Sequence, residues 1–152
     1  MSSLDLSPDQ PIFQRDGDLL VPGGLTTGPW YPGTQHGSAM MLMAALAAEQ
    51  HPSDIPRQVT RLTVDMMRAA PVAPLELVTD VRKGGRYMEV LDIVIRAGGE
   101  EYVRASAMRF RMEDVPVVER MKFSGQVPQL PDPLPEDIFA HAANREGFPS
   151  CH

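Results

Sequence analysis

The chain has 152 residues, of which 43% are hydrophobic and 22% charged, a composition sufficient for one ordinary folded domain with or without a tail. Its formal net charge of −6, from 14 basic and 20 acidic residues, argues against broad nucleic-acid binding, which needs a basic surface. The longest apolar run, ten residues, is too short to cross a membrane, and the single cysteine, Cys151, allows neither an internal disulfide nor a cysteine-based metal site.

Residues 1–35 are rich in proline and glycine. The first segment, "MSSLDLSPDQPIF", has neither the basic nor the apolar region of a signal peptide, so the cytoplasm is the expected location. The apolar piece "DLLVP" at 18–22 predicts a strand, and "GGLTTGPWYPGTQ" predicts a long ordered loop.

An apolar helix is predicted over residues 37–50. Its stretch from Ala39 to Ala48 contains only alanine, methionine and leucine, which are strong helix formers. Pro52 and Pro56 prevent the helix from continuing. Because this stretch has no polar stripe, it needs apolar neighbours on most of its sides.

Four segments with alternating or β-rich character follow, and they predict strands at 58–68, 73–83, 86–98 and 100–112. The links "KGGR" and "AGGEE" are typical of hairpins. A strand, a central helix and then long antiparallel strands is the order of a hotdog fold, an α+β architecture in which a curved antiparallel sheet wraps one apolar helix. We assign residues 1–112 to this domain and expect it to pair with a second unit, because one unit leaves a sheet edge and part of the helix uncovered.

Residues 113–152 differ in character from the domain before them. They hold six of the 15 prolines and carry seven acidic against three basic residues. We therefore predict a Pro-rich, acidic C-terminal arm or linker.

Several stretches resemble one known group of proteins. They are "GPWYPGTQHGSAMMLMAALAAE", "RLTVDMMRAAPVAPLEL", "RKGGRYMEVLDIVI" and "EYVRASAMRF". Together they look like the N-terminal half of the thioesterase-like superfamily, which is related to type II acyl-CoA thioesterases with two hotdog units in one chain. The most specific pieces are the His-Gly before the apolar helix and the strand that ends in Arg, two small residues and Pro. In that family a Pro-rich linker leads into the second unit, whereas this sequence stops soon after Gly147-Phe148.

Thioester hydrolysis needs donors that polarise the carbonyl and a base or nucleophile. The first amides of the predicted helix, those of Gly37 and Ser38, are suitable donors because helix N-terminal amides are unpaired and partly positive. Alternatively, Gly37 permits close helix packing or a sharp turn. His36 could act as a base or orient the carbonyl, or it could cap the helix.

The carboxylate is the difficult part of this hypothesis. The resemblance implies that single-unit hotdog thioesterases place an acid about nine residues past the histidine, where this chain has Ala45. In the two-unit enzymes the acid comes mainly from the second unit. Asp65 is the remaining catalytic candidate, although it could instead pair with Arg61 or lie at a subunit contact.

Other residues are candidates for substrate binding. Trp30 and Gln35, in the loop before the helix, are two of them, and Trp30 could close a pocket mouth or simply pack that loop. Arg82, Lys83 and Arg86 surround a turn and could meet the phosphates of coenzyme A, or form a solvated hairpin. Coenzyme A would be part of the substrate, with no separate cofactor. The four histidines, at 36, 51, 141 and 152, lack metal-ligand spacing.

Two functions follow from these observations. The first is an acyl-CoA thioesterase-like protein that hydrolyses an acyl thioester across a hotdog dimer interface, as a homo-oligomer or with a second hotdog unit. The second is a non-catalytic hotdog half-unit that binds acyl ligands or completes a larger oligomer. Neither involves nucleic acid or a membrane.

Overall fold

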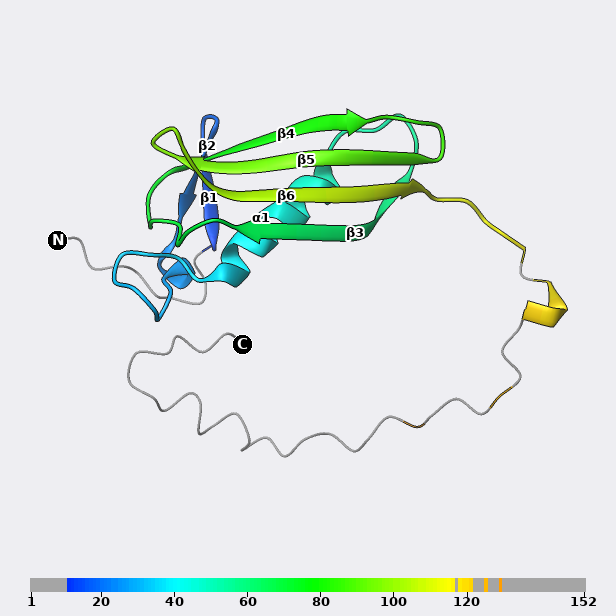
Figure 1. Ribbon diagram of the computed structural model, residues 1–152, viewed down its shortest axis with the longest axis horizontal. Coiled ribbons are helices and arrows are strands. Elements are labelled where there is room, and N and C mark those ends of the chain that lie inside the picture. The colour runs from blue at the N-terminus through cyan, green and yellow to red at the C-terminus, as the bar shows by residue number, and fades with distance from the viewer. Residues whose placement is uncertain (1–10, 117, 122–124, 126–128, 130–152) are drawn as a thin grey trace. The chain divides into compact units, whose positions relative to one another are not determined.

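The computed structural model describes residues 11–116, 118–121, 125 and 129. One long helix packs against one face of a six-stranded antiparallel sheet (Figure 1). In chain order the elements are β1 (Phe13–Asp16), β2 (Leu19–Pro22), the 3-10 helix η1 (Gly24–Thr26), α1 (Gly37–Gln50), β3 (Arg57–Met66), β4 (Leu75–Lys83), β5 (Met88–Ala97), β6 (Glu100–Arg111) and the 3-10 helix η2 (Glu119–Met121). The strand order across the sheet is β1-β2-β4-β5-β6-β3.

This architecture confirms the predicted hotdog fold. Helix α1 has the predicted bounds, and each predicted strand is found within two residues of its expected ends. The sequence did not predict β1, which is only four residues long and mostly exposed. It pairs with β2 through a turn at Gly17, whose φ of 59° is easily adopted only by glycine.

The sheet buries one face against α1. Along β5 the side chains of Leu91, Ile93 and Ile95 are fully buried, and their partners across β6 are small or β-branched residues. The β5–β6 hairpin turns at Gly98 and Gly99, which have φ values of 56° and 82°. Two consecutive residues with positive φ are what a tight hairpin needs to match the twist of its strands.

Helix α1 is apolar on all sides, yet the sheet covers only part of it. Ala44 and Ala48 are fully buried against the sheet. In contrast, Met41 is 50% exposed, Leu42 38% and Leu46 44%. The helix therefore presents an uncovered apolar stripe within the described part of the chain. None of the helices described is long and apolar enough to cross a membrane.

The described residues up to Met112 belong to one compact unit. Of the predicted arm at 113–152, the structure describes 113–116, 118–121, 125 and 129, including η2. The remaining residues of the predicted arm lie outside the described part of the chain.

Candidate functional site

A folded loop brings the start of α1 against the sheet. The backbone N–H of Gln35 donates to the Ala70 carbonyl over 2.8 Å, and that of His36 donates to the Thr26 carbonyl over 2.9 Å. Gly28 lies directly beneath this crossing, where a β-carbon would sit 2.9 Å from the backbone nitrogen of His36. Glycine is thus required at position 28 for the two backbone segments to approach so closely.

His36 is the N-cap of α1. Its Nδ1 accepts a hydrogen bond from the Ala39 backbone N–H over 3.2 Å and contacts the Ser38 hydroxyl. Its Nε2–H donates to the Leu25 carbonyl over 3.0 Å, which leaves Nδ1 as the acceptor. Both ring nitrogens are therefore engaged in holding the loop and the helix start together. A catalytic role as a base would require breaking one of these bonds.

Gly37 is the first residue of α1 and lies against Met66 of β3. A β-carbon at position 37 would be 3.1 Å from the Met66 sulfur, at the flexible end of a partly exposed side chain. Among the described residues, neither the Gly37 nor the Ser38 backbone N–H has an acceptor. These two amides are available to a ligand, as expected for the first turn of a helix.

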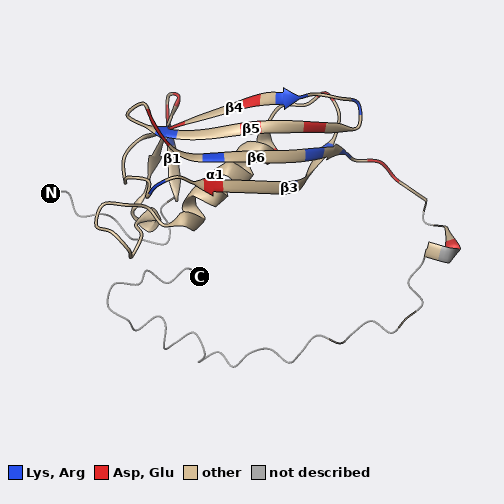
Figure 2. Cartoon of the chain, in the orientation of Figure 1, with Lys and Arg blue, Asp and Glu red and all other residues tan. Residues whose placement is uncertain are grey.

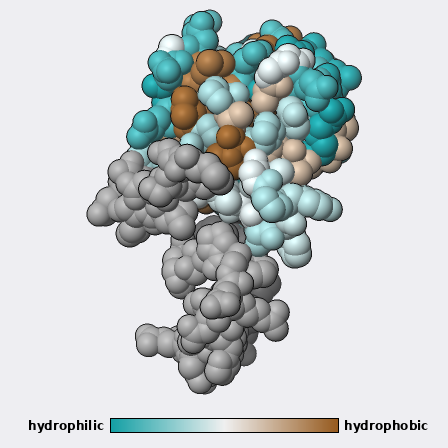
Figure 3. Space-filling model, turned by 90° about the vertical axis from the view of Figure 1, so that its left-hand side faces the viewer, coloured by the Kyte–Doolittle hydropathy of each residue, from teal (hydrophilic) through white to brown (hydrophobic). Residues whose placement is uncertain are grey.

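A hollow of about 390 Å³ opens beside the Gly37 amide. Its floor is apolar, with Met40, Met66 and Val103, and its polar groups come from the loop and from the end of β3. They belong to Trp30, Tyr31, Thr34, Gln35 and Arg68. This hollow, which we call the Gly37 pocket, contains no carboxylate among its lining residues. Figure 3 faces this end of the sheet and shows hydrophobic side chains beside polar ones.

Gln35 has an incomplete set of hydrogen bonds in this pocket. It is 5% exposed, and its Nε2 donates to the Pro71 carbonyl over 2.7 Å, which fixes the orientation of the amide. Its Oε1 is buried and has no partner in the described residues. A buried carbonyl oxygen without a donor is costly, so this atom is suited to accept a hydrogen bond from a ligand or a water molecule.

Asp65 lies on the other face of the sheet. Its neighbour Met66 lines the Gly37 pocket, and successive side chains of a strand point to opposite faces. Asp65 is exposed, and in the register of β3 and β6 it stands opposite Arg104. The Glu101 carboxylate binds the Arg104 guanidinium through two hydrogen bonds, which raises the pKa of Arg104 further above its ordinary value. The sheet separates Asp65 from the pocket of its own chain.

The predicted basic cluster also lies away from the pocket. Arg82 and Lys83 end β4, and Figure 2 shows this blue end of β4 at the opposite end of the sheet from the start of α1. Arg82 lies 3.6 Å from an Asp92 oxygen, and Arg86 lies over the Tyr87 ring. None of these three cations is among the residues that line the Gly37 pocket.

Arg68 is the cation that the structure places at the Gly37 pocket. Its Nη1 donates to Glu100 over 2.7 Å, and its guanidinium lies 5.6 Å from the centre of the Tyr102 ring. The sequence contained a signal for this residue, since Arg68 is the arginine of the strand-ending motif quoted above. Its position at the pocket depends on how β3, the β5–β6 hairpin and the loop pack together, which the sequence does not show.

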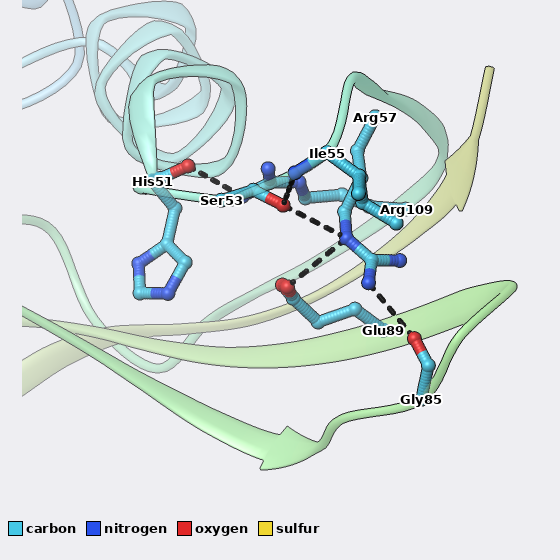
Figure 4. Close-up of polar contacts among 7 residues, drawn as sticks. All are labelled: His51, Ser53, Ile55, Arg57, Gly85, Glu89 and Arg109. Atoms are coloured by element: carbon cyan, nitrogen blue, oxygen red, sulfur yellow. Dashed lines mark hydrogen bonds and ion pairs between the residues drawn. The ribbon is translucent and has the colours of Figure 1, made fainter.

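A buried polar cluster fixes the other end of α1 to the sheet (Figure 4). Arg109, 3% exposed, donates to the carbonyl of His51, the C-cap of the helix, over 2.8 Å. Glu89 stands opposite Arg109 across β5 and β6, and its carboxylate lies 3.6 Å from the Arg57 guanidinium. Arg57 in turn donates to the Gly85 carbonyl over 2.8 Å. The Arg57–Glu89 pair and the buried Arg109 thus link the C-terminal end of α1 to β3, β5 and β6.

Comparison with known proteins identifies the family of this chain. A family model described as the acyl-CoA thioesterase N-terminal domain matches residues 26–110, more than half of the chain. The match runs from the loop before α1 to the end of β6 and so includes the whole Gly37 pocket. Among curated proteins, no sequence matches this chain.

Solved structures share the fold at low sequence identity. The BH2602 protein from Bacillus halodurans, solved with CoA, is similar with a TM-score of 0.54 and 17% identity, over 68% of this chain and 74% of that one. A mutant hypothetical thioesterase protein from Streptococcus pneumoniae gives a TM-score of 0.52 and 15% identity, over 59% and 75%. The PaaI protein from the E. coli phenylacetic acid degradation operon gives 0.49 and 21%, over 53% and 62%.

Proposed function

We propose that this chain, which belongs to the family of acyl-CoA thioesterase N-terminal domains, binds an acyl-CoA. In this proposal the thioester carbonyl lies at the backbone amide of Gly37. The observation that carries this proposal is that the Gly37 N–H has no acceptor among the described residues, while Gly37 lines a pocket of about 390 Å³. A helix N-terminal amide stabilises the negative charge that develops on a thioester oxygen when the carbon is attacked.

The polar groups of the pocket fit the rest of such a ligand. Arg68, which lines the pocket and is partly exposed, would bind a phosphate of coenzyme A in competition with Glu100. The unpaired Oε1 of Gln35 would accept a hydrogen bond from a water molecule or from an amide N–H of the ligand. The B. halodurans relative with the same fold was solved with CoA, which supports this class of ligand. No cofactor beyond the coenzyme A of the substrate is proposed.

The carboxylate that activates water would come from a second unit. None of the residues lining the Gly37 pocket is acidic, and Asp65 lies behind the sheet. The apolar stripe formed by Met41, Leu42 and Leu46 is uncovered, and β3 forms an edge of the sheet. We propose that this side pairs with a second hotdog unit, either another copy of this chain or a different one.

A pair of substitutions at position 37 tests the role of the amide. Proline is well accepted at the first position of a helix, and His36 already has the extended backbone that precedes proline, with φ −77° and ψ 151°. Gly37→Pro therefore removes the proposed donor while the helix remains. Gly37→Ala is the matched control, because it adds a β-carbon against Met66 but keeps the N–H.

The measurement is release of free thiol from a panel of acyl-CoA substrates of different chain length. We expect Gly37→Pro to lose about 100- to 1,000-fold in turnover, as for removal of an oxyanion donor, and Gly37→Ala to lose only a few fold. Equal turnover in the two variants would show that the amide is not used. No turnover by the purified wild-type chain at any chain length would exclude hydrolysis by this polypeptide alone.

A non-catalytic function is the second candidate, and the acid-free lining of the pocket favours it. In that case the chain would bind acyl-CoA without hydrolysing it. Calorimetry with a thioether analogue of an acyl-CoA would then show binding, and Arg68→Gln would weaken it. Binding without turnover supports this second function, whereas no binding would contradict both.

A further inference from the structure

A second hollow lies at the other end of α1, away from the Gly37 pocket. It has a volume of about 470 Å³, within the ordinary range for small-molecule sites. The C-terminal half of α1 forms one wall, and strands β1, β2 and β4 supply the rest. Its apolar lining comes from Phe13, Leu20, Met43, Leu46 and Leu77, and Leu46 is the residue that the groove shares with the exposed stripe of α1. We call this hollow the Arg15 groove.

The groove is distinct from the proposed thioester site. The two linings approach each other at Met40 and Met43, which are one turn apart on α1, and extend from there in opposite directions, to Gly37 and to His51. The two hollows share no lining residue. The Gly37 pocket is lined by the 30–37 loop and the end of β3, whereas the groove is lined by the first hairpin and β4.

The charges of the groove are of one sign. Its lining includes Arg15 and His51 and contains no acidic residue. Within the described part of the chain, neither the Arg15 guanidinium nor the His51 ring has a hydrogen-bond or ion-pair partner. Asp16 follows Arg15 in β1, so its side chain leaves the opposite face of the strand. The groove therefore combines an apolar wall with polar groups, among them Gln50 and Thr79, and an unpaired cation, which together complement an amphipathic anion.

We propose that the Arg15 groove binds a single-chain amphiphile with an anionic head, with its hydrocarbon chain along Met43 and Leu77 and its head group at Arg15. A fatty acid carboxylate and an alkyl phosphate share this chemistry. The proposal goes beyond the thioester site, because it concerns a different cavity and requires no hydrolysis.

Binding can be measured by calorimetry with decanoate, decyl phosphate and decanol, using the full chain. We expect the two anions to bind more tightly than decanol. Arg15→Gln should weaken the anions by about two- to fivefold, the size expected for one exposed ion pair, and leave decanol unchanged. Arg61→Gln is the matched control, since Arg61 is an exposed arginine on β3 that lines neither hollow. The preferred anion distinguishes a carboxylate from a phosphate ligand.

Two alanine-to-phenylalanine substitutions locate the hydrocarbon chain. Ala47→Phe fills the Arg15 groove and should weaken decanoate at least tenfold, whereas Ala69→Phe fills part of the Gly37 pocket and should have less than a twofold effect. The reverse result would overturn the proposal. So would equal binding of decanol and decanoate with no effect of Arg15→Gln, or a change of oligomeric mass in Ala47→Phe, which would make the groove an interface.

A measurement on the wild-type chain guards against variants that do not fold. Decanoate should shift the NMR methyl signals of Met43 and Leu20, which line the groove, and leave that of Met66 unchanged. Shifts confined to Met66 would contradict the assignment.

Discussion

Glu89→Gln should destabilise the protein strongly, although it changes only a few atoms. The Arg57 and Glu89 side chains are both 8% exposed, and their charged groups lie 3.6 Å apart. At an effective dielectric constant of about 20, charges at this distance attract by roughly 4–5 kcal/mol. Loss of the negative charge also leaves the Arg57 guanidinium without its ion-pair partner. Because breaking a buried pair costs about 3–5 kcal/mol, we expect a loss near 3 kcal/mol.

Glu100→Gln is a matched control for this experiment. Its pair with Arg68 is closer, at 2.7 Å, but the two side chains are 56% and 62% exposed. Exposed pairs contribute about 0–1 kcal/mol, so the shorter contact should cost less to break. Urea unfolding of the wild-type chain and of both variants, at one protomer concentration, measures how much unfolding free energy each substitution costs. If Glu89→Gln costs no more than Glu100→Gln, the buried cluster does not hold the helix end as argued.

Three further predictions concern the helix and its loop. Gly28→Ala should cost about 1–3 kcal/mol of unfolding free energy, because the new β-carbon would lie 2.9 Å from the backbone nitrogen of His36; an unchanged urea midpoint would contradict the close crossing. His36→Ala should cost about 1 kcal/mol through loss of the N-cap, and His36→Asn should restore most of it if capping is the main role of the side chain. Met41→Glu should lower the mass seen by sedimentation without unfolding the chain, whereas Met112→Glu, at a position 57% exposed, should not.

The sequence contained enough information for the fold. Ten consecutive strong helix formers followed by prolines left no alternative to a helix at 37–50, and period-two alternation marked the long strands. The strand β1 was missed because a four-residue segment with three polar residues carries almost no periodic signal. It forms because its hairpin with β2 adds to the edge of a sheet that the other strands build.

The candidate site was less predictable, because it depends on which ends of the strands meet. Arg82, Lys83 and Arg86 form a basic turn locally, but β4 runs away from the start of α1 and carries them with it. Arg68 lies two residues beyond β3, which runs the other way, and so reaches the Gly37 pocket. Alternation does place Arg109 on the buried face with Ala107, yet only the register of β5 against β6 shows that Glu89 lies opposite it.

The exposed stripe of the chain lacks a covering surface and its pocket lacks a carboxylate, and one partner need not supply both. The exposed stripe of Met41, Leu42 and Leu46 needs an apolar surface, and a second copy of the chain provides one with the same helix. The pocket needs a carboxylate, but a second copy brings a helix that is acid-free from Ala39 to Ala48. Pairing of identical chains therefore satisfies packing without supplying the acid, unless Glu49 or an acid outside α1 is presented at the interface. A homodimer that binds acyl-CoA but turns over only when mixed with a different hotdog unit would be the expected behaviour. Full turnover by the homodimer, lost in Glu49→Gln, would instead locate the missing carboxylate at the end of the same helix.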